Sequence, residues 1–360
     1  MIIQTIQSHM QKVEIVSDLK DCENDFRLAS EERAIVLCDS NTAKHCLPHA
    51  IDAFPQLSAY PLLVIPAGEE SKSFDSVQYI LKHLLAAGAG RESLLITIGG
   101  GMITDLGGFA ASIYKRGLRC IHIPTSLLAM VDASVGGKTG IDFNGIKNSV
   151  GSFYFPEKSI IWTGFLNSLP QRQIRCGLAE MLKHSIIAGG ETYESFLNQN
   201  QTLLLSTDAI AESIRIKNEF VLIDPYDKGQ RMALNLGHSI GHALEAWSNA
   251  GEKNPLYHGE SVAAGLIAEL FLSVRMKSFP EYELERITKW IINHNIIPKL
   301  QITEANQLIQ YATHDKKNRR GKITMSLMSS PGHVVTGCSI HEEEFLQAIR
   351  YVVKILQSND

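Results

Sequence analysis

The sequence predicts two domains, an α/β domain over residues 1–155 and a mainly α-helical domain over residues 156–360. Two patterns carry this prediction. Short apolar runs alternate with helical patterns in the first part, as they do in parallel α/β sheets. After about residue 171 the 3.6-residue period of amphipathic helices dominates the sequence. The change in pattern therefore places a domain boundary near residue 155.

The bulk composition restricts the class of protein. The chain has 360 residues, 44% of them hydrophobic and 20% charged, which is typical of a globular protein with two or three domains. A formal net charge of −4 gives no electrostatic footprint for nucleic acid. No apolar run reaches membrane-spanning length, no secretory signal is visible at the start, and the six cysteines have no C-x-x-C spacing. We expect a cytoplasmic protein that acts on small molecules, with no nucleic-acid or membrane partner.

Four buried strands are predicted in the first domain. Each is a short apolar run that ends in polar or glycine-rich residues, and together they cover residues 34–38, 62–65, 94–98 and 120–123. The carboxyl ends of parallel strands are where α/β proteins bind ligands. An amphipathic helix after residue 73 carries apolar side chains at helical spacing. These side chains are Val77, Ile80, Leu81, Leu84 and Leu85.

The second domain contains a series of helical segments. They are expected near residues 171–188, 207–222, 230–247, 259–276 and 280–294. A turn over residues 329–333 indicates a hairpin between residues 323–328 and 334–336. A final amphipathic helix is expected over residues 341–356.

Three histidines favour a metal site in the second domain. His238 and His242 are four residues apart on a predicted helix and therefore share a face, and His258 starts the next helix. Glu180, three residues before Lys183, offers a carboxylate ligand. Spacing alone leaves open the alternative that these histidines lie on the surface or are satisfied in the core.

Glycines and an aspartate at the strand ends favour a nucleotide site in the first domain. The turn at residues 99–101 lets backbone N–H groups approach a phosphate, although a purely structural turn has the same pattern. Gly107 and Gly108 indicate close packing of the following helix against another helix or a cofactor. Asp39 either bonds a ribose hydroxyl or caps the next helix.

Several cations indicate an anionic substrate. Lys138 lies in the glycine-rich segment 132–140, which is no P-loop because the upstream glycine and the preceding buried strand are missing. We interpret the segment as a loop that suits a phosphate or a carboxylate. Lys183, Lys217 and Arg231 add a basic pocket to an acidic protein, although each alone is also typical of a solvated helix face.

These motifs together resemble the 3-dehydroquinate synthase family of the sugar phosphate cyclase superfamily. They follow the family order across about residues 60–330. The matching segments are residues 99–108, 132–140, 147–148, 177–183, 235–242, 258–260 and 315–317.

The resemblance implies a Rossmann-like NAD-binding domain followed by a helical metal-binding domain. It implies that Glu180, His238 and His258 hold a divalent metal, zinc or cobalt, while His242 lies by the substrate. The implied NAD contacts are Asp39, Gly68, Glu69, Glu70, Ser71, Lys72, Gly100, Gly101, Met102, Ile103, Thr104, Asp105, Thr125, Ser126, Lys138, Lys147, Phe165, Leu166, Asn167 and Ser168. The implied catalytic and substrate residues are Asp132, Lys138, Asn148, Lys183, Lys217, Asp227, Arg231, Asn235, His242 and Lys316.

The implied reaction converts 3-deoxy-arabino-heptulosonate 7-phosphate to 3-dehydroquinate and phosphate, a step of the shikimate pathway toward chorismate and the aromatic amino acids. In the family, transient oxidation by NAD precedes phosphate elimination, reduction, ring opening and an intramolecular aldol step. The resemblance assigns the substrate phosphate to Asn148, Lys183, Asn235 and His242, and the carboxylate and hydroxyls to Lys138, Lys217 and Arg231. It also implies a homodimer.

Four positions depart from the commoner family pattern. Asp227 stands for a usual glutamate, Ser126 for a threonine, Thr104 for a glycine and Asp142 for an asparagine.

Three other activities remain as alternatives. The nearest is that of another sugar phosphate cyclase, which acts on sedoheptulose 7-phosphate or glucose 6-phosphate. A variant of the same branch that acts on an aminated substrate is another. An iron-type polyol dehydrogenase is an alternative of another class, and it would release NADH.

Overall fold

The chain folds into two compact units. The computed structural model describes residues 1–26, 33–251, 254–298, 308–313 and 323–357. The first unit comprises Met1–Ile174 and Leu205–Tyr226, and the second comprises Arg175–Leu204 and Asp227–Asp360. Among the described residues, none of the helices combines the length and apolarity needed to cross a bilayer.

The first unit is built on a seven-stranded sheet with the order β1-β2-β9-β6-β5-β3-β4. Six strands run parallel, and only β1 pairs antiparallel with its neighbour β2. Cys38 pairs with Ile98 and Gly99 with Pro124, so three central strands end at the same level. The strands are β1 (Ile2–Gln7), β2 (Lys12–Val16), β3 (Ala34–Asp39), β4 (Leu62–Ile65), β5 (Leu94–Gly99), β6 (Arg119–Pro124) and β9 (Lys158–Ile161).

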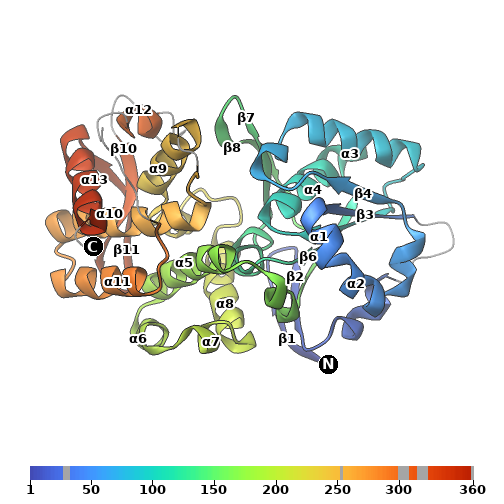
Figure 1. The fold of residues 1–360 in the computed structure, drawn as a ribbon, viewed down its shortest axis with the longest axis horizontal. Helices are drawn as coiled ribbons and strands as arrows, with labels where there is room; N and C mark the ends of the chain where they lie inside the picture. Colours follow the sequence, from blue (N-terminus) through green and yellow to red (C-terminus); the bar gives the residue numbers. More distant parts are fainter. Residues whose placement is uncertain (27–32, 252–253, 299–307, 314–322, 358–360) are drawn as a thin grey trace. The chain divides into compact units, whose positions relative to one another are not determined.

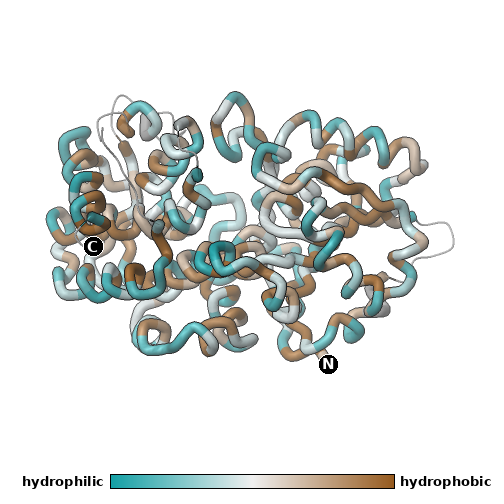
Figure 2. The backbone as a smooth tube through the Cα atoms, viewed as in Figure 1, coloured by the Kyte–Doolittle hydropathy of each residue, from teal (hydrophilic) through white to brown (hydrophobic). Residues whose placement is uncertain are grey.

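The core of the first unit lies between this sheet and two helices, α3 (Phe74–Ala86) and α4 (Gly101–Ile113), which also contact each other (Figure 1). Apolar side chains of β3 and β5 pack there against Ile80 and Leu84 of α3 and Leu106 of α4. Hydrophobic residues accordingly line the central strands in Figure 2. The remaining helices are α1 (Ser40–His45), α2 (Leu47–Ala53) and α8 (Thr207–Ile223).

The four strands predicted from apolar runs are confirmed as β3, β4, β5 and β6, but the loop predicted for the glycine-rich segment 132–140 is wrong at its end. Residues 138–140 of this segment begin an antiparallel hairpin of β7 (Lys138–Phe143) and β8 (Ile146–Phe153), whereas residues 134–137 form neither a helix nor a strand. Strand β9 lies beyond the predicted boundary at residue 155 and pairs with β2 and β6. The compact units therefore do not follow that boundary, and α8 also belongs to the first unit.

The second unit is mainly helical and is organised around one buried helix, α10 (His258–Lys277). Residues from Val262 to Leu270 of α10 are completely buried, and the helix contacts α9, α11, α13 and β10 (Figure 1). The other helices are α5 (Gln171–Ala188), α6 (Gly190–Asn198), α7 (Gln201–Leu204), α9 (His238–Gly251), α11 (Glu281–Asn293), α12 (Leu308–Thr313) and α13 (Glu342–Gln357). The predicted hairpin is confirmed as β10 (Ile323–Ser330) and β11 (His333–Ile340).

One predicted helix of the second unit is interrupted. The segment 230–247 consists of a short 3-10 helix, η7 (Gln230–Asn235), followed by α9, which begins at His238. Gly237 between them has φ +80°, a left-handed conformation that ends a helix and that glycine adopts at no steric cost. The interruption places His238 at the first turn of a new helix.

Candidate metal centre and nucleotide site

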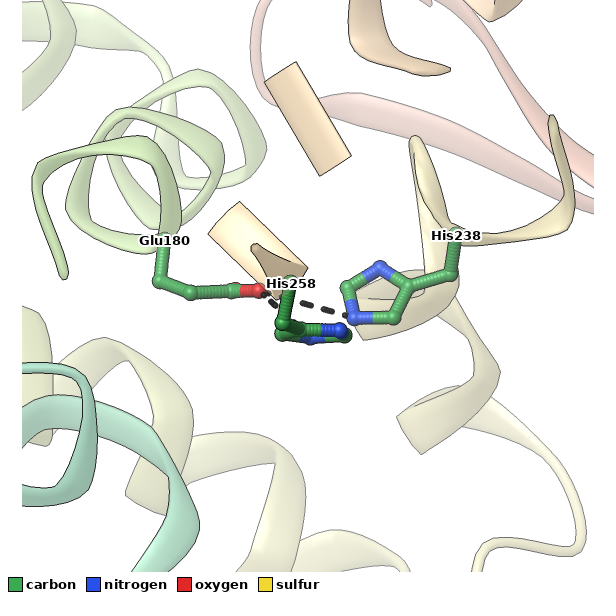
Figure 3. A group of neighbouring side chains, drawn as sticks. All are labelled: Glu180, His238 and His258. Atoms are coloured by element: carbon green, nitrogen blue, oxygen red, sulfur yellow. Dashed lines mark ion pairs between the residues drawn. The ribbon is translucent and has the colours of Figure 1, made fainter. Parts of the chain in front are cut away.

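Three side chains predicted as metal ligands converge in the second unit from three helices. Glu180 of α5, His238 of α9 and His258 of α10 point toward one another (Figure 3). Glu180 Oε1 lies 3.4 Å from His258 Nε2 and 3.6 Å from His238 Nε2. One carboxylate and two imidazoles form a donor set of catalytic zinc sites, which leave a further coordination position open.

The orientation of His238 fits a cation at this place. Its Nδ1 lies 3.2 Å from the carbonyl oxygen of Leu236 and therefore donates a proton to it. The lone pair of His238 is then on Nε2, which faces the Glu180 carboxylate. Two groups that can only accept face each other, and a bound cation satisfies both of them.

Glycines allow the helices to bring these ligands together. A Cβ at Gly241 would lie 2.8 Å from the carbonyl oxygen of Ser261, and one at Gly265 would collide with the carbonyl oxygen of Gly237. A Cβ at Gly259 would collide with the backbone of Cys176 on α5. Because these positions lack side chains, α5, α9 and α10 approach closely enough for short ligand distances.

The charges around Glu180 and His238 favour the protonation states of these two residues that bind metals. Burial raises the pKa of Glu180, but Lys183, whose Nζ lies 2.5 Å from Glu180 Oε2, outweighs it together with His238 and His258 and holds the pKa well below its usual range. Burial, followed by the charge of Lys183, holds the pKa of His238 well below its ordinary value. Glu180 is therefore ionised and His238 neutral, the forms that bind metals.

His258 contacts two carboxylates, one on each ring nitrogen. Its Nδ1 lies 3.2 Å from Oε2 of Glu245, opposite the Nε2 that faces Glu180. Burial lowers the pKa of His258, but Glu245 and Glu180 outweigh burial and raise the pKa to about 10. His242, Glu245 and His258 thus form a second group of donors that shares His258 with the first.

The sequence reasoning missed Glu245 and a second buried carboxylate, Glu269. Glu245 lies seven residues after His238, two helical turns along the same face, and this spacing is a signal that was available. Glu269 interrupts the otherwise apolar run of residues 262–272, where an unpartnered charge would be costly.

In the first unit, the predicted nucleotide residues follow strands on both sides of a topological switch point. The chain continues from β3 to β4 on one side and places β5 on the other side of β3. Open α/β sheets bind ligands at the carboxyl ends of the strands at such a point. Asp39 ends β3, and Gly100 follows β5 and caps α4.

The structure shows the capping alternative for Asp39. Its Oδ1 accepts hydrogen bonds from the backbone nitrogens of Asn41 at 2.8 Å and Thr42 at 3.0 Å. The ribose contact of Asp39 stays a prediction. The close packing expected at Gly107 is confirmed, but it is against strand β5, because a Cβ there would lie 2.5 Å from Cγ2 of Thr97.

Several predicted nucleotide residues form one charged cluster in the first unit. Lys72 Nζ lies 2.7 Å from Asp105 Oδ2 and donates to Asn148 Oδ1 at 2.6 Å. Glu69 Oε1 lies 3.7 Å from Lys72 Nζ and 3.8 Å from Lys147 Nζ. Burial lowers the pKa of Lys72, but Asp105 and Glu69 raise it overall, so this buried lysine stays charged.

Other predicted residues of the first unit are positioned less uniformly. Lys217 of α8 donates to both the backbone oxygen and Oδ1 of Asp132, at 2.6 Å each, so two predicted substrate residues contact each other. Lys138 is exposed at the start of β7. Phe165 and Leu166 are buried in a 3-10 helix, η6 (Thr163–Ser168), and leave Asn167 and Ser168 exposed.

The second unit holds the other predicted substrate residues. Arg231 is buried in η7, which ends at Asn235, two residues before the turn that leads to His238. Asp227 has φ +53°, a left-handed conformation that aspartate tolerates better than most residues. Lys316 lies outside the described residues.

Comparison with known proteins identifies the family. The family model described as 3-dehydroquinate synthase N-terminal matches residues 62–176, and the model described as 3-dehydroquinate synthase C-terminal matches residues 177–318. A 3-dehydroquinate synthase of Parabacteroides distasonis is 41% identical over 95% of this chain and 97% of its own length. One from Leptospira interrogans is 37% identical over 82% of both chains.

Solved structures with the same fold are more distant in sequence. A 2-deoxy-scyllo-inosose synthase complexed with carbaglucose-6-phosphate, NAD+ and Co2+ has a TM-score of 0.83 at 23% identity, covering 97% of this chain and 100% of that one. The 2-epi-5-epi-valiolone synthase of Streptomyces hygroscopicus subsp. jinggangensis, with NAD+ and Zn2+ bound, has a TM-score of 0.81 at 23% identity, with 98% and 99% coverage. A probable glycerol dehydrogenase of Sinorhizobium meliloti has a TM-score of 0.63 at 15% identity, covering 98% of this chain and 97% of that one. The structural matches give the fold, and the sequence matches show that the chain belongs to the 3-dehydroquinate synthase family.

Proposed function

We propose that the chain converts 3-deoxy-arabino-heptulosonate 7-phosphate to 3-dehydroquinate and phosphate in the shikimate pathway, using NAD and a divalent metal. The convergence of Glu180, His238 and His258 is the observation that supports the metal-dependent part of this proposal most directly. The match of the chain to the synthase family over both its units supports the reaction.

In this proposal the metal ion is held by Glu180 Oε1 and by Nε2 of His238 and His258. A divalent ion bound there would polarise a substrate hydroxyl and favour the loss of its proton. Lys183 keeps Glu180 ionised, and the Leu236 carbonyl keeps the lone pair of His238 on the ligating nitrogen. Zinc and cobalt both suit one carboxylate and two imidazoles.

NAD is assigned to the switch point of the first unit. It would accept a hydride from the substrate and return it within the same turnover, so that it acts catalytically. The residues proposed to bind NAD include Gly100 and Gly101, whose backbone N–H groups lie at the start of helix α4. Lys72 and Asp105 form an ion pair with each other, and this pair would hold both charges in position at the proposed NAD site.

The substrate phosphate is assigned to Asn148, Lys183, Asn235 and His242, as the family resemblance implies. Lys183 is buried with its Nζ beside Glu180, and His242 lies on the same helix face as His238. In the first unit, Lys72 can only donate, so the atom of Asn148 that faces it is the amide oxygen. The amide nitrogen of Asn148 therefore keeps its hydrogens for an anion. Lys217 and Arg231 are assigned to the carboxylate and hydroxyls.

Removal of the metal tests the proposal. Chelation should stop phosphate release, and addition of Zn2+ or Co2+ should restore it. The variant Glu180→Gln should lower turnover at least about 100-fold, more than loss of a group that only supports a ligand. Glu212→Gln is the control, because Glu212 lies on the surface and pairs with Arg215. Full activity of the chelated protein or of Glu180→Gln would contradict the metal-dependent mechanism.

We also propose that the enzyme acts as a homodimer in the cytoplasm. The mass in solution, measured by sedimentation equilibrium, tests the dimer. A monomer of 39.8 kDa with full activity would contradict it.

A further inference from the structure

A buried carboxylate of α9 contacts His258 on α10, and a buried carboxylate of α10 contacts the backbone on either side of His238 on α9. Glu245 of α9 contacts His258 of α10, with 3.2 Å between Oε2 and Nδ1. Glu269 of α10 contacts the start of α9, where it accepts from the backbone nitrogens of Gly237 at 2.6 Å and Ile240 at 3.1 Å. The two carboxylates are 1% and 0% exposed, which is costly for a charge unless it is hydrogen-bonded.

The contact of Glu245 decides which nitrogen of His258 is free to bind a metal. A carboxylate accepts a hydrogen bond, so Nδ1 carries the proton and donates it to Glu245. When a metal ion displaces the other proton of the ring, the lone pair is therefore on Nε2, which faces Glu180 at 3.4 Å. Without Glu245, both tautomers and a rotated ring would become accessible.

His238 separates this arrangement from a rival one. In the rival arrangement, His242, Glu245 and Nδ1 of His258 would bind the ion, and Glu245 would be a ligand. The Leu236 carbonyl directs Nε2 of His238 toward Glu180. An ion at Glu180 therefore uses Nε2 of both histidines, and it leaves Glu245 as the partner of Nδ1.

Glu269 acts on the backbone that carries His238. Its two oxygens bind N–H groups of the turn and of the first turn of α9, groups that have no partner within the helix. A negative charge at the amino end of a helix is also favourable. Residue 237 is a glycine with φ +80°, so it contributes no side chain that could restrain this part of the turn. Glu269 therefore fixes the direction in which His238 leaves the turn.

We propose that Glu245 and Glu269 are positioning residues of the metal centre, each fixing the ligand histidine of the opposite helix. The inference rests on the metal site of the proposed function. It predicts that either carboxylate can be lost without loss of the three ligands, yet with weaker metal binding. Supporting groups of this kind contribute about 10- to 100-fold to metal affinity.

Cobalt binding to the full-length, metal-free protein tests this inference. The dissociation constant of Co2+ is measured by competition with a chelator, and the visible spectrum of bound Co2+ reports its coordination geometry. The variants are Glu245→Gln, Glu269→Gln and Glu180→Gln. Glu283→Gln is the matched control, because Glu283 is also a buried glutamate of the second unit but bonds Tyr193 and Arg286.

We expect Glu245→Gln and Glu269→Gln to bind Co2+ about 10- to 100-fold more weakly than wild type. Glu180→Gln should lose more, and Glu283→Gln should match wild type. The Co2+-induced rise in the thermal unfolding midpoint should shrink in both positioning variants. A purely structural role would lower the midpoint equally with and without Co2+, and would contradict the inference.

Two further results would overturn it in different ways. Wild-type affinity in both positioning variants would exclude the positioning role while leaving the metal site intact. If Glu245→Gln abolishes binding and Glu180→Gln retains it, Glu245 is itself the ligand. A wild-type protein that fails to bind Co2+ would contradict the metal site and the inference together.

Discussion

The protonation of His122 is constrained by its position in the seven-stranded sheet of the first unit. It is 2% exposed in β6, and its Nδ1 lies 2.7 Å from the hydroxyl of Thr97 on the neighbouring strand. Burial lowers the pKa of His122 to about 3. The ring is therefore neutral in the folded protein at every pH at which the enzyme is expected to work.

This shift makes the stability of the fold depend on pH. The unfolded chain binds a proton at His122 below about pH 6.5, whereas the folded chain does not, so stability falls as the pH decreases from about 6.5 toward 3. The loss is about 1.4 kcal/mol for each pH unit in this range. Wild type should thus lose about 1.4 kcal/mol more than His122→Asn between about pH 7.5 and 5.5, as measured by guanidinium unfolding. Equal losses in the two proteins would contradict the assignment.

Helix α4 illustrates how glycine sets the distance between an element and the sheet. A Cβ at Gly107 would lie 2.5 Å from Thr97 Cγ2 and 3.1 Å from Leu37 Cδ2. Both contacts come from central strands whose side chains are completely buried and have no room to move. The glycine thus allows the second turn of α4 to lie close against β5 and β3.

The variant Gly107→Ala should therefore destabilise the protein by about 1–3 kcal/mol, as overpacking does in other cores. Gly90→Ala is the control, because a Cβ there meets no atom within 4 Å. In open space, alanine for glycine is neutral or stabilising by up to about 1 kcal/mol. Unfolding midpoints measure both effects, and a Gly107→Ala protein as stable as Gly90→Ala would refute the close-packing account.

Local sequence signals predicted the elements that depend on continuous patterns. Strands β3, β5 and β6 are almost fully buried and were visible as apolar runs. The hairpin β7–β8 was missed because glycines hide a strand pattern: Gly151 packs against Thr139 and Gly140 of the paired strand and leaves no side-chain alternation to detect. Strand β9 was not predicted because it has only four residues and its partners in β2 and β6 are far away in the sequence.

At the scale of the whole molecule, the sequence predicted three side chains that converge, but it did not predict the buried carboxylates around them. The spacing of His238 and His242 indicated a metal site, but the choice of His258 over His242 came from family resemblance. The sequence did not predict that Glu245 and Glu269 are buried, because a glutamate in a helix is usually solvated. Their role depends on the packing of α9 against α10, a tertiary contact that no local pattern encodes.

The membership of the family and the geometry of the metal centre lead to one account of the reaction. In the proposed reaction, the substrate would lose phosphate after a transient oxidation, and NAD would return to its starting state. A dehydrogenase with the same fold would instead release NADH in proportion to product.

The most direct test measures phosphate, 3-dehydroquinate and NADH together. The full-length protein is supplied with Zn2+, 3-deoxy-arabino-heptulosonate 7-phosphate and less NAD than substrate. We predict equal amounts of phosphate and 3-dehydroquinate, both exceeding the NAD supplied, with no accumulation of NADH. Absence of phosphate release, together with NADH formed from a simple polyol, would contradict the account.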